Sequence, residues 1–288
     1  MSGLLGVAAR VLPPGLFARL QALGKVGYLP DLRNPRTFNE RLLVKRLRDR
    51  DELIVQTADK FTLREYVRTS IGGEYLPELY DVVEDARKVD VDRLPPAYVM
   101  KGTHGSKWNR IVTQGELTNP EAQRLAADWL SRCYYWERQE WAYLELKPKV
   151  IFEENLAPGS PIDDFKVFTF AGVARMVQLD RDRFTRHSRA LFTPAWQRLN
   201  VRFLYRWPDS PLPAPQRLDE MLALAEVLGR PFEFARVDLY AVGNRIVVGE
   251  ITHYPESGVA RFVPRSFDLE LGEVWGSARP ISDTFLAT

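Results

Sequence analysis

Antiparallel hairpins, rather than strands joined by crossover helices, follow a helical first part in this sequence. Residues 15–70 carry apolar side chains at helical spacing. Short loops join three later pairs of alternating segments, which are 98–101 with 110–112, 164–170 with 174–179, and 234–240 with 245–252. Helices are expected over 119–129 and 217–228, and a short strand over 150–152. Helices segregated from antiparallel strands predict an α+β protein and argue against a parallel, doubly wound sheet.

The composition is that of an ordinary globular protein. Hydrophobic residues make up 45% and charged residues 27% of the 288 residues, enough for one large domain or two closely packed ones. Forty Lys and Arg face 38 Asp and Glu, so the net charge of +2 gives no general attraction for nucleic acid. A single cysteine, Cys133, excludes an internal disulfide and a multi-cysteine zinc site, and it fits a reducing compartment such as the cytoplasm.

The N-terminal segment is apolar and basic. Pro13-Pro14 interrupts the apolar run from Leu4 to Leu23, and no small-residue cleavage site follows it. We therefore expect neither a secretory signal nor a membrane-spanning segment, which needs roughly 20 apolar residues. Residues 1–50 carry ten Lys and Arg but three Asp and Glu. A solvated helical face is the ordinary explanation, and contact with a membrane surface is the alternative.

The motifs of several common enzyme classes are missing. There is no G-x-x-x-x-G-K-[ST] segment and no G-x-G-x-x-G after a strand, which argues against P-loop and dinucleotide-binding proteins. There is also no G-x-S-x-G elbow. The histidines, His104, His187 and His253, lack the spacing of metal ligands. Common hydrolase and dehydrogenase functions are therefore not indicated.

A glycine-containing loop from Gly102 to Asn109 joins two of the expected strands, with Lys101 at the end of the first strand. Its two glycines and its small polar residues would let backbone N–H groups approach an anion. This pattern predicts a phosphate-binding loop on a hairpin. The alternative is a flexible surface loop.

A second polar group lies on the 234–252 hairpin. Because side chains alternate along strands, Arg236 and Asp238 share one face of the first arm, and Glu250 and Thr252 share one face of the second. A carboxylate on each arm suits Mg²⁺, which commonly takes one or two carboxylates together with substrate phosphates. The alternative, carboxylates on a solvated face, is disfavoured by their apolar neighbours.

The register of this hairpin decides whether the two carboxylates meet. A two-residue turn at Gly243-Asn244 with regular pairing sets Asp238 opposite Gly249 and turns Glu250 to the other face. A three-residue loop sets Asp238 opposite Glu250. We therefore expect an odd-length loop or a bulge in this hairpin.

Three further polar signals are weak when taken alone. Asp59 is expected to cap a helix that runs through Val67, which makes Lys60 an ordinary first-turn lysine. Glu153-Glu154 ends a strand, where acidic residues commonly face solvent. Asp164 and Lys166 share a face of their strand.

Taken in chain order, nine segments resemble one family. They are Thr37-Phe38-Asn39-Glu40-Arg41, Ala58-Asp59-Lys60-Phe61, Arg64-Glu65-Tyr66-Val67, Lys101 to Asn109, Glu153-Glu154, Asp164-Phe165-Lys166, Asp180-Arg181-Asp182-Arg183-Phe184, Arg236-Val237-Asp238 and Gly249-Glu250-Ile251-Thr252. This ordered set resembles the TupA-like ATP-grasp family, named for teichuronopeptide biosynthesis, over about residues 30–275. The resemblance implies an ATP-grasp fold, in which two α+β lobes enclose MgATP. We expect a helical N-terminal region over 1–95, a small lobe with the phosphate-binding loop over 96–156, and a C-terminal lobe with the metal site over 157–288.

The resemblance also implies roles for individual residues. Residues that would contact ATP are Lys60, Lys101, Gly102, His104, Gly105, Ser106, Glu153, Glu154, Leu156, Asp164 and Lys166. Mg²⁺ would be held by Asp238, Glu250 and Thr252, and the catalytic residues would be Arg236 and Lys101. Residues that would contact an acidic substrate or lie in a substrate loop are Arg183, His187, Arg189, Ser257 and Gly258.

Two positions depart from the pattern of ATP-grasp enzymes. Thr252 stands where the wider group usually has Asn, which makes a single-metal site more plausible. Glu256 adds a negative charge to the segment where relatives carry a small-residue loop, and it could alter which acceptor binds.

The resulting expectation is a cytoplasmic, ATP-dependent carboxylate–amine ligase. Its substrates would be a small-molecule carboxylate, such as a sugar acid or an amino acid, and an amine in polysaccharide or secondary-metabolite biosynthesis. An ATP-grasp kinase and a glycosyltransferase that uses Asp180-Arg181-Asp182 are the alternatives. A non-catalytic polysaccharide-binding subunit would use the aromatic side chains of Tyr134, Tyr135, Trp136 and Trp141.

Overall fold

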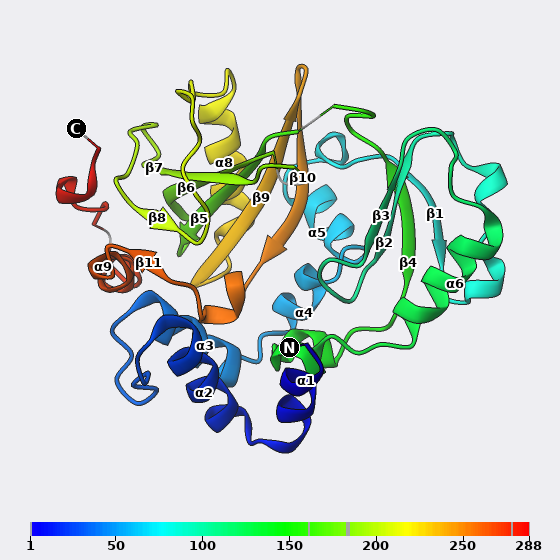
Figure 1. The fold of residues 1–288 in the computed structure, drawn as a ribbon. Helices are drawn as coiled ribbons and strands as arrows, with labels where there is room; N and C mark the ends of the chain where they lie inside the picture. Colours follow the sequence, from blue (N-terminus) through cyan, green and yellow to red (C-terminus); the bar gives the residue numbers. More distant parts are fainter. Residues whose placement is uncertain (1, 161, 183–184, 278, 288) are drawn as a thin grey trace. The chain divides into compact units, whose positions relative to one another are not determined.

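The computed structural model of the protein describes residues 2–160, 162–182, 185–277 and 279–287 (Figure 1). Its contacts divide the chain into two units. Unit 1 combines Met1–Asp49 with Ile162–Thr288, and unit 2 consists of Arg50–Pro161. Helices and antiparallel sheets occur in both units, which confirms the α+β class.

An antiparallel sheet of four strands, in the order β1-β4-β2-β3, forms the centre of unit 2. Its strands are β1 (Leu79–Val83), β2 (Tyr98–Gly102), β3 (Asn109–Val112) and β4 (Val150–Glu154). Helix α6 (Asn119–Leu130) packs on one face, where Met100 and Phe152 are buried (Figure 1). Because side chains alternate along a strand, Lys101 and Glu153 lie on the opposite face.

An antiparallel sheet of five strands, in the order β10-β9-β5-β6-β7, forms the centre of unit 1. Its strands are β5 (Asp164–Phe170), β6 (Val173–Arg181), β7 (Ser188–Phe192), β9 (Phe234–Val242) and β10 (Arg245–Thr252). A small second sheet pairs β8 (Arg202–Phe203) with β11 (Phe262–Val263).

The helices are distributed between both units. Those of unit 1 are α1 (Ser2–Val11), α2 (Pro14–Val26), α3 (Phe38–Arg48), α8 (Leu218–Gly229) and α9 (Ser266–Val274). Those of unit 2, besides α6, are α4 (Glu52–Ala58), α5 (Leu63–Ser70) and α7 (Tyr135–Arg138). Short 3₁₀ helices are η1 (Gly73–Tyr75), η2 (Ala86–Lys88), η3 (Val91–Arg93), η4 (Trp141–Leu144), η5 (Pro255–Gly258) and η6 (Asp283–Phe285).

The two faces of the unit 1 sheet are covered differently. Helix α8 packs on one face and buries Leu228. On the other face, the core formed with α3 and α9 lies at one end of the strands, where the rings of Phe38 and Phe234 are 5.2 Å apart in an edge-to-face contact. Along this same face Phe168 gives way to Lys166 in β5, and Phe234 to Arg236 in β9. The face therefore changes from apolar to polar along each strand.

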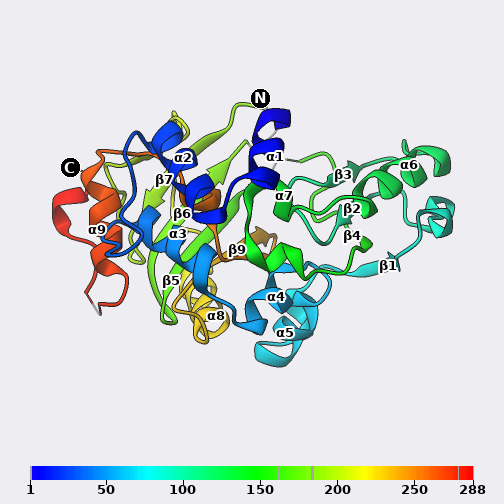
Figure 2. The same cartoon turned by 90° about the horizontal axis from the view of Figure 1, so that it is seen from below.

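Helix α3 ties the N-terminal part of the chain to the C-terminal part of unit 1. A capping box of Thr37 and Glu40 begins the helix. The Asn39 side chain then donates to the Ala260 carbonyl at 2.8 Å and to the Asp268 carboxylate at 2.9 Å, and α3 lies against α9 (Figure 2). Because of these contacts residues 1–49 group with the C-terminal sheet, whereas the prediction placed them with residues 50–95.

A bulge sets the register of the β9–β10 hairpin. The turn has two residues, since Val242 pairs with Arg245. The pairing then shifts between Val248 and Glu250, so Glu250 lies opposite Asp238. This confirms the expected irregularity and identifies it as a bulge at Gly249 rather than a longer loop.

The expected hairpins and most expected helices are present, and the differences lie in short or capped segments. Helix α5 begins at Leu63 instead of Lys60, because Asp59 caps the preceding turn by accepting from the N–H groups of Phe61 and Thr62 at 2.8 and 2.9 Å. Strands β1 and β7 and helix α9 were not predicted. Within the described residues, no helix is both long enough and apolar enough to cross a membrane.

Gly272 in α9 should be intolerant of a side chain because a Cβ there would lie 1.9 Å from the Arg36 carbonyl oxygen. We expect Gly272→Ala to lower the free energy of unfolding by at least about 1–3 kcal/mol, the usual cost of overpacking. Gly24 in α2 is the control, since nothing lies within 4 Å of its added Cβ. Gly24→Ala should leave stability unchanged or raise it by up to about 1 kcal/mol. Urea unfolding measures both, and equal stability of the two variants would contradict this packing.

Candidate active site

Unit 2 presents two cations around one buried carboxylate. Lys101 of β2 pairs with Glu153 of β4 on the sheet face opposite α6. Arg64 of α5 lies 3.8 Å from Glu153 and donates to the Pro77 carbonyl at 2.7 Å. Burial lowers the pKa of Arg64, while Glu153 opposes that shift. The cluster carries more positive than negative charge, which suits an anionic ligand. The motif Arg64-Glu65-Tyr66-Val67 contains Arg64, but Arg64 was not predicted as a site residue. Its position four residues after Lys60, one turn of the expected helix, could have indicated that both side chains lie on one side.

The loop from Gly102 to Asn109 is anchored at both ends. Gly102 donates its N–H to the Trp108 carbonyl at 2.9 Å, and Thr103 donates to the Lys149 carbonyl at 3.0 Å. The Lys60 ammonium donates to the Gly105 carbonyl at 2.6 Å. Lys60 therefore lies at the loop, in which Ser106, Lys107 and Asn109 are exposed.

His104 and Gly105 pack into the core of unit 2. The His104 ring is buried, its Nε2 lies 3.0 Å from the Trp129 carbonyl oxygen, and burial lowers its pKa. A Cβ at Gly105 would lie 2.5 Å from the Trp108 ring. Packing against Trp108 accounts for both residues, so a phosphate contact from the His104 side chain would require the loop to rearrange.

The residues expected near adenine lie at the end of β4. Glu154 makes two hydrogen bonds with the backbone of Glu78. Its N–H donates to the Glu78 carbonyl at 2.9 Å, and its carboxylate accepts from the Glu78 N–H at 3.2 Å. Leu156 is half-buried just beyond the strand. Glu153 differs from these two because its carboxylate points to Lys101 and Arg64.

Unit 1 holds a buried ion-pair network on the polar part of its sheet. Lys166 of β5 lies 2.7 Å from Asp164 and 2.5 Å from Asp238 of β9. Arg236 donates two hydrogen bonds of 2.7 Å to the same Asp238 carboxylate. The side chains of these four residues are at most 9% exposed. Such a network is stable only when every charge has a partner.

The bulge adds Glu250 and Thr252 to this network. The Arg236 guanidinium lies 3.3 Å from the Glu250 carboxylate and donates to the Thr252 hydroxyl at 3.1 Å. Thr252 in turn donates to Glu250 at 2.9 Å. The Glu250 side chain is 41% exposed, so this end of the network reaches solvent.

Burial and the neighbouring charges shift the pKa values of Asp238 and Arg236 in opposite directions. Burial raises the pKa of Asp238 to about 6, although Arg236 and Lys166 oppose the shift. Burial alone would lower the pKa of Arg236, but the adjacent Asp238 carboxylate raises it above the usual value. Arg236 therefore stays positively charged.

The donor set fits a magnesium ion that also binds phosphate. Asp238 and Glu250 supply carboxylate oxygens and Thr252 a hydroxyl from adjacent strands, which is the oxygen chemistry Mg²⁺ prefers. Arg236 and Lys166 occupy the Asp238 oxygens in this structure. Across the described part of the chain, no three His, Cys, Asp or Glu side chains form a metal site by themselves.

Asp180 lies in a neighbouring cluster on the same face. Arg189 donates to its two carboxylate oxygens at 2.5 and 2.9 Å, and Gln178 donates at 3.0 Å. His187 Nε2 lies 3.3 Å from Asp180. Burial would raise the pKa of Asp180, but Arg189 more than offsets it and holds the pKa well below its usual range. Gln178 was not predicted, because a register shift between Phe168 and Thr169 sets it opposite Lys166, where regular pairing would set Val177.

The segment with Ser257 and Gly258 packs on α3. The Ser257 carbonyl accepts from the buried Arg46 at 3.0 Å, and a Cβ at Gly258 would lie 2.9 Å from Leu42. The Glu256 carboxylate lies 3.7 Å from Arg189. The structure thus brings this segment near His187 and Arg189, whereas Arg183 lies outside the described residues.

The aromatic residues considered for sugar stacking are half-buried and contact other side chains. Tyr134 packs with Trp108 and Tyr143 at ring distances of 5.9 and 4.8 Å, and Tyr135 packs edge-to-face with Trp136. Trp141 lies 4.9 Å from the Arg50 guanidinium, a cation–π contact. Tyr134 therefore belongs to the edge of the unit 2 core.

We compared the sequence and the fold with those of known proteins. The sequence matches the family model described as TupA-like ATPgrasp over residues 40–275. No curated protein matches it. Similar solved structures include the ATP-grasp ligase PsnB complexed with a phosphomimetic variant of minimal precursor, Mg and ADP, at 14% identity and a TM-score of 0.42, covering 70% of this chain and 51% of that chain. Another is D-alanine–D-alanine ligase from Bacillus anthracis complexed with ATP, at 14% identity and a TM-score of 0.39, covering 69% of this chain and 54% of that chain.

The chain thus spans about half the length of these two ligases. The family match covers most of the chain, and the expected ATP-grasp fold is confirmed. On this match, the chain belongs to the TupA-like ATP-grasp family.

Proposed function

We propose that this protein is an ATP-dependent carboxylate–amine ligase that forms an amide through an acyl phosphate. The observation that carries the proposal is the buried network in which Asp238 and Glu250 lie opposite each other beside Arg236 and Lys166. Two oxygen ligands next to two cations are what phosphoryl transfer requires, because it depends on positioning and charge neutralisation.

In this proposal the nucleotide-binding residues have distinct roles. Lys60, Lys101 and the backbone of Gly102, Gly105 and Ser106 bind phosphate, while Glu153, Glu154 and Leu156 lie along the adenine. Asp164, next to Lys166, binds the ribose. The anchored loop and the cationic surroundings of Glu153 support these assignments.

Magnesium would be held by Asp238, Glu250 and Thr252. When bound, it would neutralise charge on the phosphate oxygens. Arg236, now on Asp238, binds the transferring phosphoryl group, and Lys101 holds the phosphate chain. A substrate carboxylate oxygen attacks the γ-phosphorus, the bond to the ADP oxygen breaks, and the amine then displaces phosphate from the acyl carbon.

The charged side chains around Asp180 indicate the general class of the substrate. We propose a small carboxylate, such as a sugar acid or an amino acid, that lies near Arg189, His187 and the segment of Ser257 and Gly258. Polysaccharide or secondary-metabolite biosynthesis in the cytoplasm is the setting that we propose for it.

A glycosyltransferase that uses Asp180-Arg181-Asp182 is not favoured. The motif requires both carboxylates to face one metal and a sugar nucleotide. Asp180 is instead buried and bound through both oxygens by Arg189, and Arg181 pairs with Asp163 at 3.0 Å.

Lys101→Met should weaken binding of a non-hydrolysable ATP analogue in the presence of Mg²⁺ by about ten- to a hundredfold, since charged hydrogen bonds contribute about 1.5–3 kcal/mol. Isothermal titration calorimetry measures this, with UDP-sugar titrated in parallel. Lys88→Met is the matched control, because Lys88 is exposed in η2. Unchanged affinity in a folded Lys101→Met variant would remove Lys101 from the site, and binding of UDP-sugar alone would favour a glycosyltransferase.

Glu250→Gln should lower the apparent affinity for Mg²⁺ in ADP release at least about tenfold, because it removes one carboxylate charge from the metal site. We prefer it to a change at Asp238, because that change would remove the buried carboxylate that Arg236 and Lys166 share, at a cost of about 3–5 kcal/mol. Glu145→Gln, at an exposed position, is the control. A variant with the same Mg²⁺ dependence as the wild type would exclude Glu250 as a ligand.

The reaction type is tested by a screen of carboxylates with hydroxylamine as the acceptor. A ligase should release ADP only when a carboxylate is present and should form the corresponding hydroxamate, because hydroxylamine captures an acyl phosphate. ADP release with a hydroxyl substrate, and without hydroxamate formation, would instead identify a kinase.

A further inference from the structure

Six large apolar side chains near the N-terminus are exposed and take no part in the clusters described above. We call them the N-terminal apolar surface, and they are Val7, Val11, Leu16, Leu20, Leu23 and Leu29. Their exposed fractions lie between 47% and 73%. Apolar groups of this size gathered within thirty residues commonly mark an interaction site.

Helix α2 is apolar on both of its faces. Phe17, Ala22 and Val26 are buried against the rest of unit 1. Leu16, Leu20 and Leu23 follow the i, i+4, i+7 spacing and so share the opposite, exposed face. A helix on the surface of a globular protein normally has a polar outer face, and one that is apolar all round is normally buried. The outer face of α2 therefore has the composition of a contact surface.

Positive charge flanks this surface, and negative charge is absent from its segment. Residues 1–30 contain no Asp or Glu. Arg10 directly precedes Val11, Arg19 directly precedes Leu20, and Lys25 lies in the last turn of α2. Both helices thus repeat one pattern, an exposed apolar stripe with a cation at its side.

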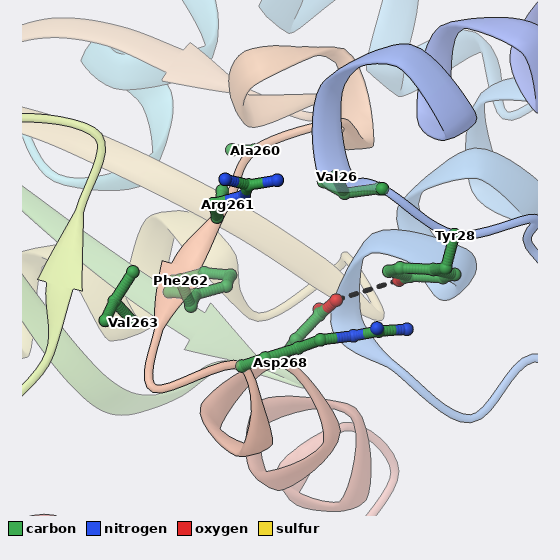
Figure 3. A pocket seen from close by; sticks show the side chains of 9 residues that line it. Val26, Tyr28, Ala260, Arg261, Phe262, Val263 and Asp268 are labelled. Carbon is green, nitrogen blue, oxygen red and sulfur yellow. Dashed lines mark hydrogen bonds between the residues drawn. The ribbon is translucent and has the colours of Figure 1, made fainter.

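A pocket of about 350 Å³ lies at the C-terminal end of α2 (Figure 3). Val26 and Phe262 contribute apolar walls, and Arg261 reaches toward Gly27, whose added Cβ would lie 3.4 Å from the guanidinium. Arg265 lies 4.4 Å above the ring of Tyr28. Arg261 and Arg265 are exposed, so two guanidinium groups lie beside apolar walls at the C-terminal end of α2.

The carboxylate in this pocket is already bound. Asp268 accepts from the Tyr28 hydroxyl at 2.8 Å and from the Asn39 side chain at 2.9 Å. Burial raises the pKa of Asp268, which disfavours its charged form. Its oxygens are therefore already occupied by neighbouring donors.

We propose that α1 and α2 dock the protein on a membrane surface rich in anionic phospholipid. The leucines of α2 enter the boundary between headgroups and acyl chains, and the flanking Arg and Lys side chains pair with lipid phosphates, as in interfacial amphipathic helices. A second copy of the chain fits less well, because a two-fold contact would bring the same cations together. This inference is independent of the proposed reaction.

Sedimentation with vesicles of phosphatidylcholine, alone or mixed with phosphatidylglycerol, tests the proposal on the full chain without nucleotide. The protein should bind the mixed vesicles at least about tenfold more strongly than the neutral ones, and high salt should weaken this binding. Leu16→Ser/Leu20→Ser/Leu23→Ser should lose at least about tenfold in binding. Its control is Leu144→Ser/Val173→Ser/Val227→Ser, which changes three exposed apolar residues elsewhere.

A charge series provides a second test that does not depend on the folding of the leucine variant. Arg10→Gln/Arg19→Gln/Lys25→Gln should lose at least about tenfold in binding to the mixed vesicles, because each cation near an anionic surface contributes about 1 kcal/mol. Lys88→Gln/Arg124→Gln/Lys147→Gln should bind as the wild type does. Equal binding to neutral vesicles, no binding to either kind, or a dimer in sedimentation velocity that the leucine variant dissociates would overturn the proposal.

Discussion

The carboxylate of Asp238, buried between the cations of Arg236 and Lys166, is the interaction on which the architecture of unit 1 depends. An isolated charge at such a depth is strongly disfavoured, so each group depends on its charged neighbours, which also include Asp164 beside Lys166 and Glu250 beside Arg236. The network also explains why α3 and α9 cover one end of the sheet face and not the other. A helix with an apolar face could not pack over these charges, and the strands remain polar there.

Strands β5 and β9 thus carry core residues at one end and charged residues at the other. At one end Phe168 and Phe234 anchor the core through aromatic contacts with Phe38. Two positions along each strand from these rings, Lys166 and Arg236 belong to the buried ion-pair network. The aromatic end fixes the strand positions and so fixes the polar side chains, which is the arrangement that a preorganised electrostatic site needs.

Regular patterns made much of this predictable from the sequence. Alternation predicted the three hairpins, and the sharing of faces placed Arg236 with Asp238 and Glu250 with Thr252. For Asp238 and Glu250 to lie opposite each other, the hairpin also needed an irregular register. Alternation alone could not decide between a longer loop and a bulge at Gly249. The bulge brings position 249 close to the Tyr240 ring, where a Cβ would lie 2.7 Å from Cε2, and alternation does not encode such a contact.

Other features depend on contacts between distant segments, which periodicity does not encode. The burial of His104 follows from packing against Trp108 and Trp129, so a residue that looked suited to phosphate is part of a core. The pairing of Asp180 with Arg189 likewise withdraws a carboxylate from an apparent metal motif. The membership of residues 1–49 in unit 1 depends on Asn39 meeting Asp268, 229 residues away.

The contact between Asn39 and Asp268 affects how the chain can fold during synthesis. Unit 1 is discontinuous, because unit 2 is inserted between its two parts. During synthesis the segment of unit 2 is complete before the five-stranded sheet of unit 1 exists, so it can fold first. Ala22 of α2 can already pack with Leu43 of α3, but the side of α3 that carries Phe38 and Leu42 stays uncovered until the final third of the chain emerges. This delay exposes that apolar side of α3 to chaperones and to aggregation during synthesis.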